Sequence, residues 1–215
     1  MRHIRKEAGS CTERKDSRMK FIGITGGVGA GKSAILVYLD KKADIRVMLA
    51  DEIAHELMKP GTECYDKIKE TFSGADIYGT DGSFDRRKLA DFLFSDERRR
   101  LALNGIVHPA VKQYVKEQYA LEKEKGVLSF LVLEAALLIE EHYDEICDEL
   151  WYIYTSEENR RVRLKESRGY SDTKIDGILK SQLTEDNYRS ACAVVIDNNG
   201  PIEGTYAQIE KALGR

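Results

Sequence analysis

The sequence predicts a three-layer α/β protein in which helices cover both faces of a five-stranded parallel sheet. Three observations lead to this fold class. Five short apolar runs suit buried strands, helix-like segments separate them, and each run is nearly continuous in apolar character. Parallel strands are covered on both faces, so they read as continuous apolar runs rather than as an alternating pattern.

The expected strands are, in chain order, KFIGIT (20–25), IRVMLAD (45–51), VLSFLVLE (127–134), ELWYIYT (149–155) and CAVVIDN (192–198). The first three each lead into a helical pattern: GKSAILVYLDKK, EIAHELM and AALLIEE. Strands that alternate with helices indicate crossover connections and a parallel sheet.

Two charged, helix-rich stretches interrupt this alternation. In 62–126, apolar residues recur at helical spacing, first as Leu89, Phe92 and Leu93 and later as Val107, Val111, Tyr114 and Val115. We therefore expect a helical insertion between the second and third strands. A second helical stretch, 156–189, lies between the fourth and fifth strands.

Composition and charge narrow the classes of protein. Hydrophobic residues make up 42% of the chain and charged residues 33%, which is typical of a soluble protein. The net charge of −3 gives no electrostatic reason to expect nucleic acid or an anionic membrane as a partner. Four cysteines, Cys11, Cys64, Cys147 and Cys192, are too scattered for a zinc site, so we expect reduced thiols in the cytoplasm.

The first 18 residues, MRHIRKEAGSCTERKDSR, differ from the rest of the chain. They lack apolar periodicity and a hydrophobic signal core, so we expect a disordered extension or sequence upstream of a misassigned start. A transit peptide or a nucleic-acid-binding arm is disfavoured, because acidic residues are interspersed among the basic ones.

A glycine-rich stretch, GITGGVGAGKSA (23–34), lies between the first strand and its helix. It matches G-x-x-x-x-G-K-[ST] in the structural context that this phosphate-binding motif needs. Glycines let backbone N–H groups approach an oligophosphate, Lys32 reaches the β- and γ-phosphates, and Ser33 ligates Mg²⁺. The expected ATP-binding residues are Gly26, Gly27, Val28, Gly29, Ala30, Gly31, Lys32 and Ser33. The alternative is a chance glycine-rich turn, and the motif leaves open whether water or an acceptor receives the phosphoryl group.

Two carboxylates end strands near this loop. Asp51 follows the second strand, where it suits a general base for an attacking hydroxyl or, equally, the N-cap of the next helix. Glu134 ends the third strand, where binding of Mg²⁺ or of the acceptor is favoured over a helix cap. His55 lies one helical turn after Asp51, and His108 precedes Pro109 at an expected helix start; each is as well explained by structure as by ligand contact.

Four arginines, Arg160, Arg161, Arg163 and Arg168, occur in ENRRVRLKESRGYS (158–171). A solvated helix face is the ordinary explanation for such a run. Beside a phosphate loop we favour a lid that neutralises a transferring phosphoryl group and excludes water, with Arg163 and Arg168 as its active side chains.

Together these stretches resemble the dephospho-coenzyme A kinase family of small-molecule kinases with a phosphate loop (P-loop). The order and spacing of IGITGGVGAGKS, LADEIAHELMKPG, FDRRKLADFLFSDERRRLALNGIVHPAV, RVRLKESRGYS and VVIDNNG carry the resemblance, which covers 19–215. It implies ATP- and Mg²⁺-dependent phosphorylation of the ribose 3′-hydroxyl of dephospho-coenzyme A, the last step of coenzyme A biosynthesis, in a cytoplasmic enzyme. The expected partner is this small molecule, with no nucleic acid or membrane, in a monomer or weak homo-oligomer.

The resemblance also implies a P-loop NTPase fold divided into a core, an acceptor-binding region and a lid. The core takes 19–60, 127–155 and 190–215, the helical acceptor region 61–126 and the lid 156–189. The implied catalytic residues are Asp51, Lys32, Arg163 and Arg168. The implied acceptor-binding residues are Asp51, His55, His108 and Glu134. Asn198 is implied near the adenine, Ser33 on Mg²⁺, and Glu134 in the outer shell of the metal.

The chain departs from the family after its third strand. Glu134, Ala136 and Ile139 stand where the family has aspartate, proline and phenylalanine, and Cys192-Ala193 replaces Ala-Asp. Losing the proline restores an N–H and frees φ, so we expect altered acceptor geometry. Two other functions stay open: a kinase for another nucleoside or nucleotide, and a nucleotide-binding regulator with weakened catalysis.

Overall fold

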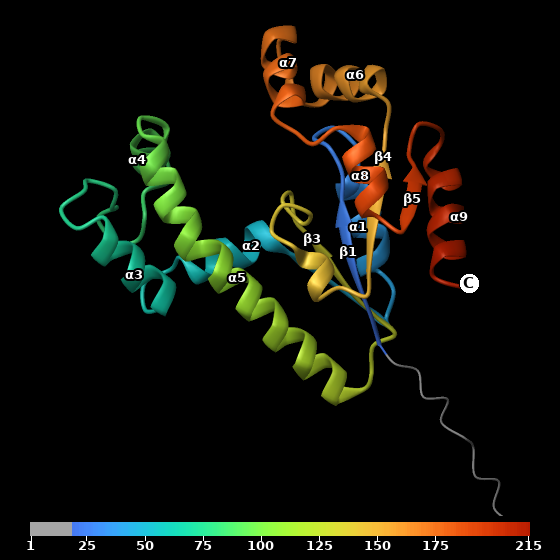
Figure 1. Ribbon diagram of the computed structural model, residues 1–215, viewed down its shortest axis with the longest axis horizontal. Coiled ribbons are helices and arrows are strands. Elements are labelled where there is room, and N and C mark those ends of the chain that lie inside the picture. The colour runs from blue at the N-terminus through green and yellow to red at the C-terminus, as the bar shows by residue number, and fades with distance from the viewer. Residues whose placement is uncertain (1–18) are drawn as a thin grey trace, which may run out of the picture.

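A computed structural model describes residues 19–215, with a five-stranded sheet at its centre (Figure 1). The strands are β1 (Lys20–Thr25), β2 (Ile45–Leu49), β3 (Phe130–Glu134), β4 (Glu149–Tyr154) and β5 (Val194–Asp197). Their order is β2-β3-β1-β4-β5, and every pairing is parallel. The predicted fold class is confirmed. The expected extension, 1–18, lies outside the described residues.

The two faces of the sheet bury different side chains, as the period of a strand requires. On one face Ile22, Ile24 and Val132 pack with α1 (Lys32–Asp40) and α9 (Ile202–Ala212). On the other, alternate residues such as Phe21 and Leu131 pack with helices of the insertion. Because both faces are buried, the strands appear in the sequence as continuous apolar runs.

The second strand is shorter than expected, and this changes the setting of Asp51. β2 ends at Leu49 and α2 (Ala50–Leu57) begins at the next residue. Asp51 therefore lies within the first turn of α2, and the N-cap position belongs to Leu49, which makes no side-chain cap. The N-cap interpretation of Asp51 is wrong. The carboxylate is left exposed near the carboxyl end of the sheet.

The insertion between β2 and β3 contains α3 (Glu63–Thr71), α4 (Arg86–Phe94) and α5 (Glu97–Lys125). In Figure 1, α3, α4 and the N-terminal half of α5 stand apart from the sheet, and we call them the helical arm. The C-terminal half of α5 runs back along the sheet. One helix thus joins the arm to the core.

Pro109 lies inside α5, so the predicted helix start at this residue is wrong. The helix begins at Glu97, where the Asp96 side chain accepts a hydrogen bond from Arg98 N at 2.8 Å. A proline inside a helix loses one hydrogen bond and crowds the carbonyl four residues back. Buried side chains on both sides of it, including Val107 and Val111, keep the helix continuous.

The segment after β3 is not the helix that AALLIEE suggested. It turns through 136–142 and ends in a short 3₁₀ helix, η1 (Tyr143–Glu145). His142 takes a left-handed conformation with φ 52°, while Leu138 and Tyr143 are buried in the core. Burial of these two side chains decides the path of the backbone, so the helix-cap alternative for Glu134 is wrong.

Between β4 and β5 lie α6 (Glu157–Arg168), α7 (Asp172–Lys180) and α8 (Glu185–Ala191). Ser156 caps α6 by accepting a hydrogen bond from Asn159 N, and Gly169 ends the helix with φ 62°. Cys64, Cys147 and Cys192 are free and buried, whereas Cys11 lies outside the described residues. Over 19–215, no helix combines the length and the apolar character that a membrane crossing requires.

Candidate active site

The loop between β1 and α1 needs its glycines for backbone conformation and for space. Gly29 and Gly31 have φ of 84° and 85°, in the left-handed region that favours glycine. A Cβ at Gly31 would lie 2.5 Å from Asn198 Nδ2. Gly31 is also the N-cap of α1 and makes no side-chain cap. The N–H groups of the first turn therefore stay available to an anion.

Three side chains support this loop through hydrogen bonds to the carbonyl oxygen of Ala30. It accepts hydrogen bonds from Asn198 Nδ2 at 2.7 Å, Thr155 Oγ1 at 3.0 Å and Arg163 Nη1 at 3.3 Å. Asn198 is only 3% exposed, and its Oδ1 accepts from Thr205 Oγ1 at 2.9 Å. The Asn198 amide therefore supports the loop, while its contact with adenine stays a prediction.

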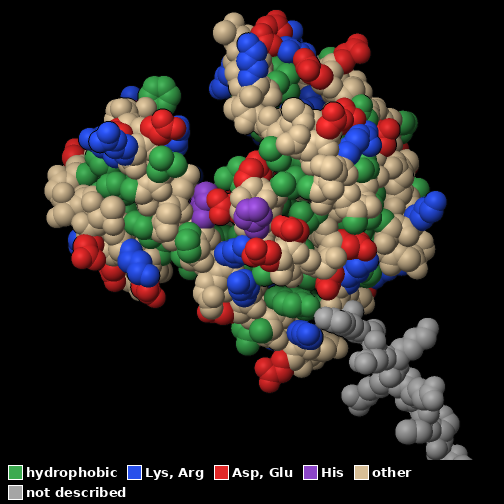
Figure 2. Space-filling model, viewed as in Figure 1, with side chains coloured by type: hydrophobic (Ala, Val, Ile, Leu, Met, Phe, Trp, Pro, Cys, Tyr) green, Lys and Arg blue, Asp and Glu red, His purple; other side chains and the backbone are tan. Residues whose placement is uncertain are grey.

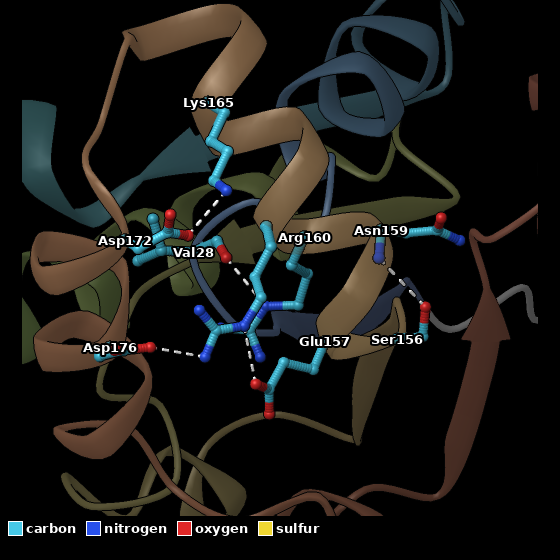
Figure 3. Close-up of polar contacts among 9 residues, drawn as sticks. Val28, Ser156, Glu157, Asn159, Arg160, Lys165, Asp172 and Asp176 are labelled. Atoms are coloured by element: carbon cyan, nitrogen blue, oxygen red, sulfur yellow. Dashed lines mark hydrogen bonds and ion pairs between the residues drawn. The ribbon is translucent and has the colours of Figure 1, made fainter.

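Two arginines of α6, Arg160 and Arg163, reach the loop, and Figure 3 shows Arg160 beside Val28. Arg163 Nη2 donates to Asn198 O at 2.7 Å, and Arg160 Nε donates to Val28 O at 2.9 Å. Arg160 also donates to Gln182, and its guanidinium lies over Gly27, where a Cβ would be 2.4 Å from Arg160 Cζ. Burial lowers the pKa of Arg160. Sequence analysis did not choose Arg160, although its spacing of three from Arg163 places both on one helix face.

The other two arginines of the stretch lie elsewhere. Arg161 pairs with Glu157 at 2.8 Å and with Asp176 at 2.6 Å, which ties α6 to α7 (Figure 3). Arg168 is exposed at the end of α6, with its guanidinium 5.9 Å from the centroid of the Tyr170 ring. The structure thus brings Arg163 to the loop and leaves the catalytic role of Arg168 a prediction.

Lys32 and Glu134 form a half-buried pair beside the loop. Lys32 Nζ donates to Gly26 O at 2.6 Å and lies 3.4 Å from Glu134 Oε1. Burial lowers the pKa of Lys32, and the carboxylates of Glu134 and Asp51 partly oppose that shift. Burial likewise raises the pKa of Glu134, against the effect of Lys32. Two incompletely solvated charges therefore face the position where phosphates would lie.

Asp51 lines a cavity of about 160 Å³ together with His108, Ala135, Ala136 and Glu141, among others. His108 Nδ1 contacts Glu141 Oε1 at 2.7 Å. One turn further along α5, Lys112 donates to Glu141 O at 2.9 Å and to His142 O at 3.0 Å. His108 and Lys112 therefore hold the segment after β3 in place next to Asp51.

His55 is on the exposed side of α2 and does not line the Asp51 cavity. Its Nε2 lies 3.1 Å from Arg86 Nη2, at the start of α4. Figure 2 shows the molecule hollowed between the helical arm and α6–α7. The arm therefore borders one side of this hollow.

Sequence analysis also missed Thr25, the last residue of β1. Its Oγ1 is buried and has no hydrogen-bond partner among the described residues. The only sequence signal was a hydroxyl immediately before Gly26 at the end of a strand.

The donors at the loop suit Mg²⁺ held mainly through substrate. Within 19–215, no group of three or more His, Cys, Asp or Glu residues is arranged to hold a metal ion. Ser33 presents an exposed hydroxyl in the first turn of α1, and Glu134 presents a carboxylate. Mg²⁺ prefers oxygen ligands, and it commonly binds through one or two protein groups together with phosphates and water.

Comparison with known proteins identifies a family that this chain matches. The dephospho-CoA kinase family model matches residues 20–204. Dephospho-CoA kinase of Shouchella clausii is 36% identical over 194 residues, covering 90% of this chain and 97% of the relative. Dephospho-CoA kinase of Symbiobacterium thermophilum is 35% identical over 197 residues, covering 90% and 80%.

Solved structures agree in fold. The crystal structure of TT1252 from Thermus thermophilus has a TM-score of 0.73 and 27% identity, covering 92% of this chain and 97% of the other. Dephospho-CoA kinase from Campylobacter jejuni has a TM-score of 0.68 at 19% identity, covering 90% and 95%. The family model and the curated relatives span nearly all of the described residues, and the chain belongs to the dephospho-CoA kinase family.

Proposed function

We propose that this enzyme transfers the γ-phosphoryl group of ATP to the ribose 3′-hydroxyl of dephospho-CoA, forming CoA and ADP. The observation that carries the proposal is the supported phosphate loop with the Lys32–Glu134 pair beside it, in a chain of this family. A bond forms between the 3′-oxygen and the γ-phosphorus, and the bond from that phosphorus to the β,γ-bridging oxygen breaks. The hydroxyl proton passes to Asp51.

The loop residues Gly26–Ser33 bind the ATP phosphates through backbone N–H groups. Lys32 leaves the Gly26 carbonyl, 2.6 Å away, for the β- and γ-phosphates, which offer a stronger, charge-assisted acceptor. Ser33 holds Mg²⁺, with Glu134 in its outer shell. The metal, when bound, neutralises charge on the phosphates and orients them.

Asp51 orients the acceptor hydroxyl and takes its proton late. The phosphoryl transition state is loose, so the hydroxyl needs little activation before transfer. His108 keeps Glu141, and with it the segment after β3, against the Asp51 cavity. The other proposed acceptor contacts are His55 and Glu134.

The helices of 156–189 serve as a lid, and those of 61–126 as the acceptor-binding region. Arg160 and Arg163 already lie against the loop, where they stabilise charge on the transferring group. Arg168 joins them on lid closure. We place the enzyme in the cytoplasm, consistent with its free buried cysteines.

The test is a mass-spectrometric assay with Mg²⁺-ATP, dephospho-CoA and competing nucleosides. We expect wild type to form CoA and Lys32→Ala to form almost none. Ala136 stands where the family has proline and lines the Asp51 cavity. The competing nucleosides therefore test whether this cavity takes a different acceptor. A phosphorylated nucleoside in place of CoA would overturn the acceptor assignment, and ATP binding without transfer would indicate a nucleotide-binding regulator.

A further inference from the structure

A second cavity, of about 520 Å³, lies between the end of α2 and the start of α4. Three basic residues line it: His55 and Lys59 from the end of α2 and the turn after it, and Arg86 from the first turn of α4. Asp81 is its one acidic lining residue, and its Oδ1 accepts hydrogen bonds from Ser83 N at 3.0 Å and Ser83 Oγ at 2.7 Å. The lining therefore carries a net positive charge.

Arg86 differs from Lys59, the other permanently charged basic residue of this cavity, in having no carboxylate partner among the described residues. Lys59 Nζ is paired with the Glu56 carboxylate at 2.5 and 2.6 Å. Across residues 19–215, Arg86 makes no ion pair with a carboxylate. It lies instead 3.1 Å from His55 Nε2. An arginine only donates, so Nε2 is the acceptor in this contact.

This arrangement leaves most of the guanidinium available. Of its five N–H donors, one is used by His55, and the side chain is exposed beside the cavity. A guanidinium held at one corner by the His55 imidazole presents its fork in a defined orientation. Phosphate and carboxylate oxygens both match such a fork, because two parallel charge-assisted bonds form at once. Of these two groups, the acceptor of the proposed function carries phosphates.

The position of this cavity relative to Asp51 identifies the phosphate. Asp51, His55 and Met58 lie at i, i+4 and i+7, on one face of α2 and its C-cap. Four residues of helix rise about 6 Å. In an adenosine 5′-phosphate, five bonds of roughly 1.5 Å separate the 3′-oxygen from the 5′-phosphorus, a span of similar length. An acceptor whose 3′-hydroxyl lies at Asp51 is thus long enough for its 5′-phosphates to reach the level of His55, which contacts Arg86 at 3.1 Å.

We propose that Arg86 binds the 5′-diphosphate of the acceptor, with His55 as the residue that positions its guanidinium. The inference rests on the proposed function and adds the group by which this site selects dephospho-CoA over an unphosphorylated nucleoside. The phosphate loop recognises one substrate by its oligophosphate, and the cavity between α2 and α4 recognises the other by its diphosphate.

Neighbouring arginines on α4 give a matched pair of variants for the test. Arg87 follows Arg86, is exposed and does not line the cavity, so Arg87→Gln removes the same charge at nearly the same place. In Arg86→Gln we expect the KM for dephospho-CoA to rise about 10- to 100-fold, as losing a charge-assisted contact predicts. The KM for ATP and the kcat at saturation should stay within about 3-fold of wild type.

Three further measurements separate binding from general effects. Inhibition by adenosine, which has no phosphate, should be the same in Arg86→Gln and Arg87→Gln. Arg86→Lys, which keeps the charge without the fork, should fall between Arg86→Gln and wild type. His55→Ala should raise the KM for dephospho-CoA by a smaller factor than Arg86→Gln does, because it removes the contact that orients the guanidinium and leaves the Arg86 charge in place.

Failure of this inference is distinguishable from failure of the proposed function. If wild type forms no CoA, the proposed function and this inference fall together. If wild type forms CoA but Arg86→Gln and Arg87→Gln share one KM for dephospho-CoA, only the diphosphate assignment is overturned. Equal losses of dephospho-CoA and adenosine affinity in Arg86→Gln would also overturn it, since they indicate a disturbed arm rather than a lost phosphate contact.

Discussion

The phosphate loop and the helical arm are stabilised by different kinds of interaction. Side chains from the residue after β4, from α6 and from the segment after β5 converge on the loop and donate hydrogen bonds to the Ala30 carbonyl. Many polar contacts of the arm are exposed ion pairs, such as Lys88 with Asp76 at 2.6 Å and Arg100 with Glu97 at 3.3 Å. Only its apolar interior, with residues such as Ile68 and Leu103, is buried.

This difference follows from what each part has to do. A transferring phosphoryl group is stabilised by donors whose orientation exists before the reaction, so the loop needs buried and directed support. In the proposed function the arm admits a long acceptor, and in the structure it joins the sheet mainly through α2 and α5 (Figure 1). Changes in the loop should therefore be costly for catalysis and stability, and changes on the surface of the arm should be mild.

The largest effect on catalysis is expected from removing the ammonium group of Lys32. Lys32→Ala should lower kcat by about 10³-fold or more, because it removes a preorganised cation from the phosphoryl site. Its thermal unfolding should change little, since the lost ammonium is itself half desolvated. Single-turnover CoA formation measures the first quantity and circular dichroism the second. A kcat within about 10-fold of wild type would contradict the assignment.

Two glycine substitutions compare the loop and the arm directly. Gly31→Ala should cost about 2–3 kcal/mol of unfolding free energy, because left-handed strain adds to a 2.5 Å contact with Asn198. Gly74, after α3, has a similar φ of 79° but nothing within 4 Å of an added Cβ. Gly74→Ala should therefore cost only about 1–2 kcal/mol, which is the backbone term alone. Urea titration that gave equal losses would remove the distinction between the two regions.

The raised pKa of Glu134 predicts how activity depends on pH. The carboxylate has to be ionised to pair with Lys32 and to serve the metal, so kcat should fall on acidification at a pH above 4.5, the ordinary value for glutamate. Acidification lowers the activity, but protonation of Glu134 favours the folded state. Because the pKa of Glu134 is higher in the folded than in the unfolded protein, this contribution to stability is present at low pH and is lost as the pH rises through the folded-state pKa. Glu134→Gln should remove this acid limb, which stopped-flow assays across the pH range would show.

The smallest effect is expected on the surface of the arm. Arg100→Ala breaks an exposed pair with Glu97 and should change the unfolding free energy by less than about 0.5 kcal/mol, with kcat and both KM values unaltered. Urea titration and steady-state kinetics measure both. A loss as large as that of Gly31→Ala would show that the polar surface of the arm is structurally coupled to the site.

Several features of the molecule were predictable because they depend on local backbone requirements. The glycines, Lys32 and Ser33 identify the phosphate loop within twelve residues, and continuous apolar runs identify buried parallel strands. Residue spacing predicted helix boundaries less well where side-chain packing determines them. Pro109 predicted a helix start, yet α5 passes through it because Val107 and Val111 are buried on either side.

The sequence by itself determined the fold class, the family and the position of the phosphate loop, since each is written in contiguous residues or in a regular period. Only the tertiary structure decided which arginines of α6 face the loop, that Asn198 supports the loop by a hydrogen bond, and that Arg86 contacts His55 beside a cavity. These contacts join residues 31 to 168 positions apart. Their geometry depends on how whole helices pack against the sheet, which no local pattern encodes.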